Sequence, residues 1–132
     1  MNFDTLFANP KGRTSRTHFV PALIVLAAVL AFYAFFVTGR TAHFCMLVLL
    51  YPAIVLHARR LHDMGQTAWL LAAPAVLAVG AFAIKLKYLS LGAQFDAGAP
   101  YGALAVWAVF SLWGCLGKGQ AEANRFGAPL AA

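Results

Sequence analysis

The fold is decided by an uncharged run at residues 19–37, which reads FVPALIVLAAVLAFYAFFV. A bilayer core about 30 Å thick is crossed by a helix of about 20 apolar residues, and this run has about that length. It is too long for the apolar part of a signal peptide, which has about 7–15 residues, and no A-x-A-like cleavage site follows it. We therefore interpret it as an uncleaved first transmembrane helix.

Three further runs of similar length lie at residues 41–58, 67–84 and 98–116, and all four lack Asp, Glu, Lys and Arg. The chain of 132 residues is 62% hydrophobic and 11% charged, whereas soluble domains carry about 25% charged residues. A chain this short cannot bury so much apolar surface in a water-soluble core. Alternation typical of membrane strands is absent. The sequence therefore predicts one all-α membrane domain over residues 1–132, a four-transmembrane-helix bundle.

Prolines and small residues predict how these helices bend and pack. Pro52 and Pro74 lie inside the second and third runs and should kink them, whereas Pro21 falls in the first turn of the first. Small residues also recur at helical spacing, which lets membrane helices approach closely. We interpret these faces as contacts within the bundle, with a dimer face as the alternative. They are Ala27, Ala31 and Ala34; Ala68, Ala72 and Ala75; and Gly98 with Gly102.

The basic residues lie between the apolar runs and predict the orientation. The net charge is +6, from ten Lys and Arg against four acidic residues. With four spans, one side of the membrane holds seven of the cations and the other holds three. Because Lys and Arg favour the cytoplasmic side, both termini should be cytoplasmic. No nucleic-acid-binding motif accompanies the charge. The larger set is Lys11, Arg13, Arg16, Arg59, Arg60, Lys118 and Arg125, and the smaller is Arg40, Lys85 and Lys87.

The unusual polar residues follow the second run, where residues 57–65 read HARRLHDMG. If the helix continues past the bilayer, Arg59 and Asp63 are spaced i, i+4 and should pair. Gly65 then marks the end of the helix. Two further motifs lie at the same membrane depth, GRTSR at residues 12–16 and NRFG at residues 124–127.

These three motifs, in this order around four spans, resemble the DUF805 family of small bacterial inner-membrane proteins. The resemblance covers nearly the whole chain, and the central motif is the specific one. Val20 and Thr67-Ala68 depart from the family's usual Trp and Ser-Gly. The resemblance implies a four-helix fold and a multi-pass location in the bacterial inner membrane, but it implies no reaction. The matching positions are Gly12, Arg13, Ser15, Arg16 and Phe19; Arg59, Arg60, Leu61, His62, Asp63, Gly65 and Trp69; and Asn124, Phe126 and Gly127.

Three interpretations of these motifs differ in what the arginines do. In the first, the arginines pair with Asp63, Glu122 and helix C-terminal carbonyls and tie the termini to the central loop. In the second, they bind the phosphate of an anionic phospholipid headgroup. The third, an enzyme, is disfavoured because His57 and His62 are five residues apart and point in different directions. A transporter is disfavoured because the four runs contain no ionisable Asp, Glu, Lys or Arg.

The sequence thus favours a small scaffold or accessory membrane protein, with an anionic-lipid-binding or transport-linked protein as the alternative. We expect no catalytic residue, no metal site and no cofactor. The expected partners are the bilayer, anionic phospholipid and a second membrane protein, and nucleic acid is not expected. The candidate lipid- or partner-binding residues are Arg13, Arg16, Arg59, Arg60, His62, Asp63, Asn124 and Arg125.

Overall fold

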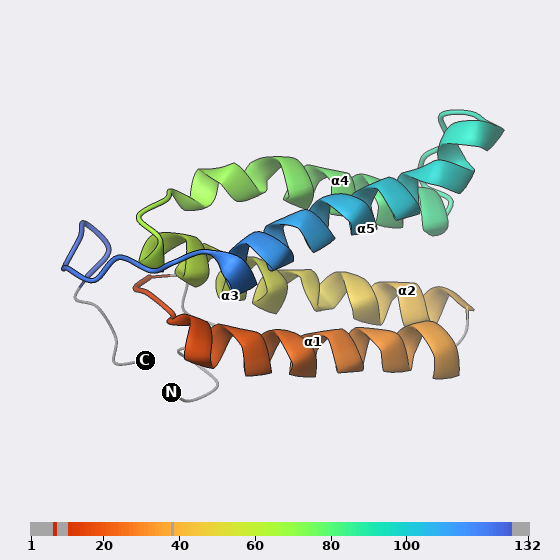
Figure 1. Cartoon of the computed structure of the whole chain (residues 1–132). Helices are drawn as coiled ribbons and strands as arrows, with labels where there is room; N and C mark the ends of the chain where they lie inside the picture. The colour runs from red at the N-terminus through yellow and green to blue at the C-terminus, as the bar shows by residue number, and fades with distance from the viewer. Residues whose placement is uncertain (1–6, 8–10, 38, 128–132) are drawn as a thin grey trace.

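The computed structural model describes residue 7, residues 11–37 and residues 39–127, and within these residues the regular elements are all helices. They form four helical spans, each long and apolar enough to cross a membrane: Arg16–Phe36, Gly39–Asp63, Ala68–Lys85 and Ala93–Leu116. The spans run side by side along their length (Figure 1). The prediction of an all-helical chain with four membrane-length helices is confirmed. The orientation of the termini is a separate question and stays a prediction.

The first two spans form an antiparallel pair. Helix α1 (Arg16–Phe36) is continuous, with Pro21 inside it. Pro21 is thus beyond the first turn, contrary to the sequence prediction, because the helix begins at Arg16 rather than 19. The second span consists of α2 (Gly39–Val48) and α3 (Leu50–Asp63). The break between them lies one turn before Pro52, whose missing N–H leaves the Val48 carbonyl without its usual helical donor. The predicted interruption near Pro52 is confirmed.

The third span also starts with an irregularity. A short 3₁₀ helix, η2 (Ala68–Leu71), begins after Thr67, whose hydroxyl accepts the Trp69 N–H at 3.3 Å. It leads into α4 (Ala72–Lys85). Pro74 therefore occupies the first turn of α4, where a backbone N–H has no helical partner. Its carbonyl accepts the Trp107 indole N–H at 2.9 Å, which links α4 to the fourth span.

The fourth span, α5 (Ala93–Leu116), begins earlier than the predicted residue 98. Its first turn includes Asp96, whose carboxylate accepts the Leu91 N–H at 2.9 Å and the Ser90 hydroxyl at 2.6 Å. An acidic side chain is favourable at a helix N-terminus, so the helix extends past the end of the apolar run. Hydropathy alone marks only the apolar part of such a helix.

The core is small and lies where α1, α3 and α5 meet. Phe19, Leu26 and Leu56 are its large buried members, and Trp107 packs against it. By contrast, many large apolar side chains face outward: Phe35 is 80% exposed and Leu116 is 76% exposed. Such a surface is costly in water and natural in lipid. The four apolar helices therefore indicate a multi-pass membrane protein.

Two of the three faces of small residues lie on this outer surface, whereas Ala68 of the third packs against the buried residues of α3 and η2. Ala27, Ala31 and Ala34 of α1 are all exposed. Gly98 and Gly102 of α5 are exposed too, and a Cβ added at either would meet no other heavy atom within 4 Å. The interpretation of these two faces as contacts within the bundle is therefore wrong. The bundle packs through other residues, and these faces are open to lipid or to another protein.

Candidate functional site

The polar motif after residue 57 is built into one end of the bundle. Helix α3 continues through it to Asp63, as the sequence anticipated, and Gly65 follows with a φ of +79°. Two other segments pack on this helix end: residues 11–15, here called the strap, and residues 117–127, here called the tail. All three lie at the same end of the bundle (Figure 1). We call the buried residues Arg13, Arg59, Arg60 and Asp63 the arginine cluster.

Asp63 is the centre of this cluster. Its side chain is 7% exposed and pairs with two arginines. Arg13 from the strap reaches Oδ1 at 2.9 Å, and Arg60 from the preceding turn reaches Oδ2 at 2.5 Å. The Asp63 carbonyl accepts the Gln120 N–H from the tail at 2.7 Å. One residue of α3 therefore holds both the strap and the tail.

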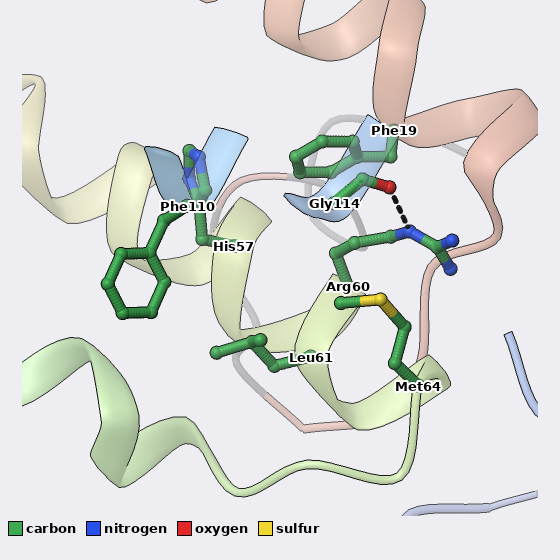
Figure 2. A pocket seen from close by; sticks show the side chains of 7 residues that line it. All are labelled: Phe19, His57, Arg60, Leu61, Met64, Phe110 and Gly114. Carbon is green, nitrogen blue, oxygen red and sulfur yellow. Dashed lines mark hydrogen bonds between the residues drawn. The ribbon is translucent and has the colours of Figure 1, made fainter. Parts of the chain in front are cut away.

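Arg60 joins α3 to the end of α5. Its guanidinium donates to the carbonyls of Gly114 at 2.7 Å and Gly117 at 2.6 Å. These carbonyls belong to the last turn of α5 and its C-cap, where backbone acceptors have no helical donors. Figure 2 shows Arg60 directed at the Gly114 carbonyl, with the Phe19 ring beside that glycine. Although charged, Arg60 is only 1% exposed.

Arg13 binds the tail in the same way. Beyond its pair with Asp63, it donates to the carbonyls of Gln120 at 2.6 Å, Glu122 at 3.0 Å and Gly127 at 3.1 Å. Glu122 thus contributes its backbone oxygen to the arginine cluster. The strap arginine therefore fixes the course of the tail through backbone acceptors, which any residue type provides.

Arg59 does not pair with Asp63, so that prediction is wrong. Its guanidinium donates to the Thr14 hydroxyl at 3.0 Å, to the Arg13 carbonyl at 2.9 Å and to the Lys11 carbonyl. The Arg59 carbonyl in turn accepts the Thr14 N–H at 3.1 Å. Arg59 therefore binds the strap, while the i, i+3 neighbour Arg60 takes the place by Asp63.

His62 contacts both the strap and the tail, outside the arginine cluster. The Nδ1 atom of His62 donates to the Gly12 carbonyl of the strap at 2.8 Å. The His62 ring stacks on Phe126 of the tail, with centroids 3.9 Å apart and planes at 9°. Asn124 donates its side-chain amide to the His62 carbonyl at 3.0 Å. Arg125 is exposed, with its guanidinium 4.8 Å from the centre of the Phe126 ring.

The comparisons with known proteins identify the family of the chain. The family model described as "Protein of unknown function (DUF805)" matches residues 7–128, nearly the whole chain. The chain belongs to the DUF805 family. No curated protein and no solved structure matches it. In this DUF805 chain, the three motifs that carry the resemblance meet at one end of the bundle, although up to about a hundred residues separate them along the sequence.

Not every candidate residue of this DUF805 protein takes part in the hydrogen bonds between the strap, the end of α3 and the tail. Arg13, Arg59, Arg60, His62, Asp63 and Asn124 are brought together by the hydrogen bonds above. Arg16 is the first residue of α1 and is exposed, and its guanidinium forms no hydrogen bond with the described residues. Arg125 is also exposed, and its guanidinium lies over the Phe126 ring.

His57 lies deeper in the bundle than the arginine cluster. Its Nδ1 donates to the Ala53 carbonyl at 2.7 Å, and its Nε2 lies 2.8 Å from the Ser111 hydroxyl. The rings of Phe19 and Trp107 meet it edge-on at 5.4 and 5.1 Å. The space between His57 and its neighbours toward Arg60 leaves no room for a water molecule. His57 therefore acts as a satisfied packing residue that joins α3 to α5.

Glycines at and just after the end of α5 pack closely against the arginine cluster, and sequence reasoning missed them. A Cβ at Gly114 would lie 2.7 Å from the Phe19 ring, and one at Gly119 would overlap the Asp63 carboxylate. These positions need glycine because other groups approach the backbone closely. The sequence does contain a signal for this packing, namely the close spacing of Gly114, Gly117 and Gly119. Such spacing is compatible with a site of close packing as well as with a loop.

Proposed function

We propose that this DUF805 protein is a small scaffold or accessory subunit of the bacterial inner membrane, multi-pass, with both termini in the cytoplasm. In this proposal it is not an enzyme, and the arginine cluster is a clamp that holds the two ends of the chain against the second span. The clamp gives the protein a fixed cytoplasmic end and leaves its apolar flanks free for a membrane partner.

One observation supports a structural role for the arginine cluster. The guanidinium groups of Arg13, Arg59 and Arg60 are buried, and they donate to Asp63, to the Thr14 hydroxyl and to backbone carbonyls of the strap, α5 and the tail. In the described residues no buried side-chain nitrogen or oxygen lacks a partner. A substrate phosphate or a headgroup would have to displace these bonds to reach the three arginines. Such saturation supports a structural role over a binding role for them.

The orientation rests on the distribution of Lys and Arg. It is tested by fusing a reporter that is active only outside the cytoplasm to residue 132, and separately to a site after Gly92 in the connection between α4 and α5. The proposal expects no activity from the first fusion and strong activity from the second. Activity from the first fusion alone would mean that the protein is inserted the other way round.

The accessory role rests on the outward faces of small residues. Ala27, Ala31 and Ala34 present a shallow stripe on α1, to which a second helix can come closer than to a stripe of Phe or Leu. The test extracts the chain from its own membrane in native nanodiscs and measures which proteins accompany it, and in what ratio. A constant ratio to one membrane protein supports the proposal, whereas the chain alone in every preparation contradicts it.

A pair of matched variants locates that contact. Ala31→Trp fills the small-residue stripe, and Val76→Trp adds the same bulk at a position on α4 that is 70% exposed. Both side chains face outward, so neither substitution disturbs the core. We expect Ala31→Trp to release the partner and Val76→Trp to retain it. Release by both variants would point to a loss of folding, which thermal unfolding of each variant in detergent detects.

A further inference from the structure

A hollow opens beside the clamp, lined in part by His62, the neighbour of Asp63 in the sequence. It has a volume of about 380 Å³, within the range of about 300–1,000 Å³ typical of small-molecule sites. It is formed by the start of the strap, the end of α3, the start of η2 and the tail. Its lining residues are Lys11, Gly12, His62, Ala68, Arg125 and Phe126. Three of them can carry positive charge and none can carry negative charge.

The cations of the hollow differ from those of the arginine cluster. Lys11 and Arg125 are exposed, whereas Arg13, Arg59 and Arg60 are buried. Among the described residues, the Arg125 guanidinium donates no hydrogen bond. It is held instead over the Phe126 ring, which is itself stacked on His62. The stack orients Arg125 and leaves its donors for a ligand, a geometry suited to bidentate binding of an oxyanion.

His62 holds this stack in place. A carbonyl can only accept, so the 2.8 Å contact with the Gly12 carbonyl shows that Nδ1 carries a proton. That hydrogen bond positions the ring on which Phe126 stacks, and Arg125 lies over Phe126 in turn. Two cations, Lys11 and Arg125, therefore line the hollow beside rings that are held in place.

The position of the hollow indicates where its ligand comes from. Trp69 follows the lining residue Ala68 in η2, which packs on α3, and is 82% exposed. An exposed Trp at the end of a transmembrane helix is typical of the headgroup level of a bilayer. The hollow therefore lies at the depth of the lipid phosphates rather than in bulk water. Basic pockets at this depth on the cytoplasmic side bind anionic headgroups.

We propose that this hollow binds the phosphate group of an anionic membrane phospholipid, with Arg125 and Lys11 as its charged donors. The site lies beside the clamp and uses none of the guanidinium groups of Arg13, Arg59 and Arg60. This inference goes beyond the scaffold role. The clamp needs no bound lipid, so the scaffold role does not require a lipid in the hollow.

The experiment measures lipid binding by native mass spectrometry of the full chain in detergent, with phosphatidylglycerol and phosphatidylcholine added separately. The variant is Lys11→Gln with Arg125→Gln. Its matched control is Arg16→Gln with Lys118→Gln, which removes the same charge from two exposed residues that do not line the hollow. Each cation near a membrane surface strengthens anion binding about fivefold. We therefore expect the variant to weaken phosphatidylglycerol binding about thirtyfold, and the control to change it little.

The proposal is contradicted if the control variant loses as much affinity as the hollow variant, because the charge would then act diffusely. It is also contradicted if the unmodified chain binds phosphatidylcholine as tightly as phosphatidylglycerol. A third arm adds soluble glycerol 3-phosphate. Displacement of the lipid at equal concentration would show that a free phosphate ester, not a membrane lipid, is the ligand. If Lys11→Gln reduces thermal stability, Arg125→Gln alone still tests the site, with an expected loss of about fivefold.

Discussion

The two ends of the bundle use arginine in different ways. At the cluster end, where the strap and tail meet α3, Arg60 is 1% exposed and bonds to the Asp63 carboxylate and to backbone carbonyls of α5 and its C-cap. At the loop end, where α1 turns into α2 and α4 connects to α5, Arg40 is exposed. It donates to the Leu86 carbonyl at 2.5 Å and lies 5.4 Å from the centre of the Tyr88 ring.

This difference shows that the surroundings of an arginine, rather than its charge, determine how much it contributes to the stability of the fold. A buried charge is costly unless it is paired and hydrogen-bonded, so each partner at the cluster end depends on the others. An exposed charge exchanges its protein contacts for water at little cost. The strap, α3, α5 and the tail are therefore coupled through the arginine cluster, whereas the loop end is held by separate weak contacts.

The largest effect is expected from Asp63→Ala. This change leaves Arg13 and Arg60 buried without their carboxylate, and breaking a buried pair costs about 3–5 kcal/mol. Unfolding of the purified protein in detergent, by heat or by denaturant, should show a large loss of stability. An effect below about 1 kcal/mol would mean that water reaches the arginine cluster and that the two ends do not differ as described.

Double variants sharpen this result by separating an arginine that pairs with Asp63 from one that binds the strap. Arg13→Ala combined with Asp63→Ala should cost less than the sum of the single changes, with a coupling of about 0.5–3 kcal/mol, because the pair is direct. Arg59→Ala combined with Asp63→Ala should be closer to additive, because Arg59 binds the strap. Coupling between Arg59 and Asp63, with additivity between Arg13 and Asp63, would instead support the i, i+4 pair that the sequence suggested.

Two glycines of α5, one at the cluster end and one on its outer face, give the next largest contrast. Gly114→Ala places a methyl group 2.7 Å from the Phe19 ring and 3.2 Å from Arg60 Cγ, and overpacking of this kind costs about 1–3 kcal/mol. Gly102→Ala meets open space on the outer face of α5 and replaces a poor helix former. It should be neutral or stabilise the fold by up to about 1 kcal/mol. Equal losses in the two variants would show that the cluster end is no more tightly packed.

The sequence was sufficient for features that depend on local chemistry. Uncharged runs near 20 residues predicted the four spans, and Pro52 predicted the break between α2 and α3. Gly65 predicted the end of α3, because a left-handed residue is needed there. Each of these features is determined by a few neighbouring residues, so no knowledge of the rest of the chain is required.

Contacts between distant segments could not be predicted in the same way. The i, i+4 rule compared Arg59 only with its own helix, whereas its actual partners, such as Thr14 and the Arg13 carbonyl, come from the strap. Carbonyl acceptors such as that of Gly117 leave no trace in side-chain identity. The Ala31 face was misassigned because helical spacing identifies a face but not what covers it. The family resemblance indicated which residues matter but not which of them touch.

The smallest effect is expected from Arg40→Ala at the loop end. The side chain is exposed and loses one carbonyl contact and two ring contacts, with Phe44 and Tyr88. Exposed cation–π contacts contribute about 0.5–1 kcal/mol each, and both rings lie near the limit of about 6 Å for such contacts, so the low end applies. Water can donate to the Leu86 carbonyl in place of Arg40. The loss of stability should therefore stay below about 1 kcal/mol in the same unfolding assay used for Asp63→Ala.

Arg40→Lys retains the charge and should recover most of this loss if the ring contacts are responsible. A loss comparable to that of Asp63→Ala would mean that the connection between α4 and α5 is anchored through Arg40. The loop end would then be a second clamp rather than a set of independent contacts.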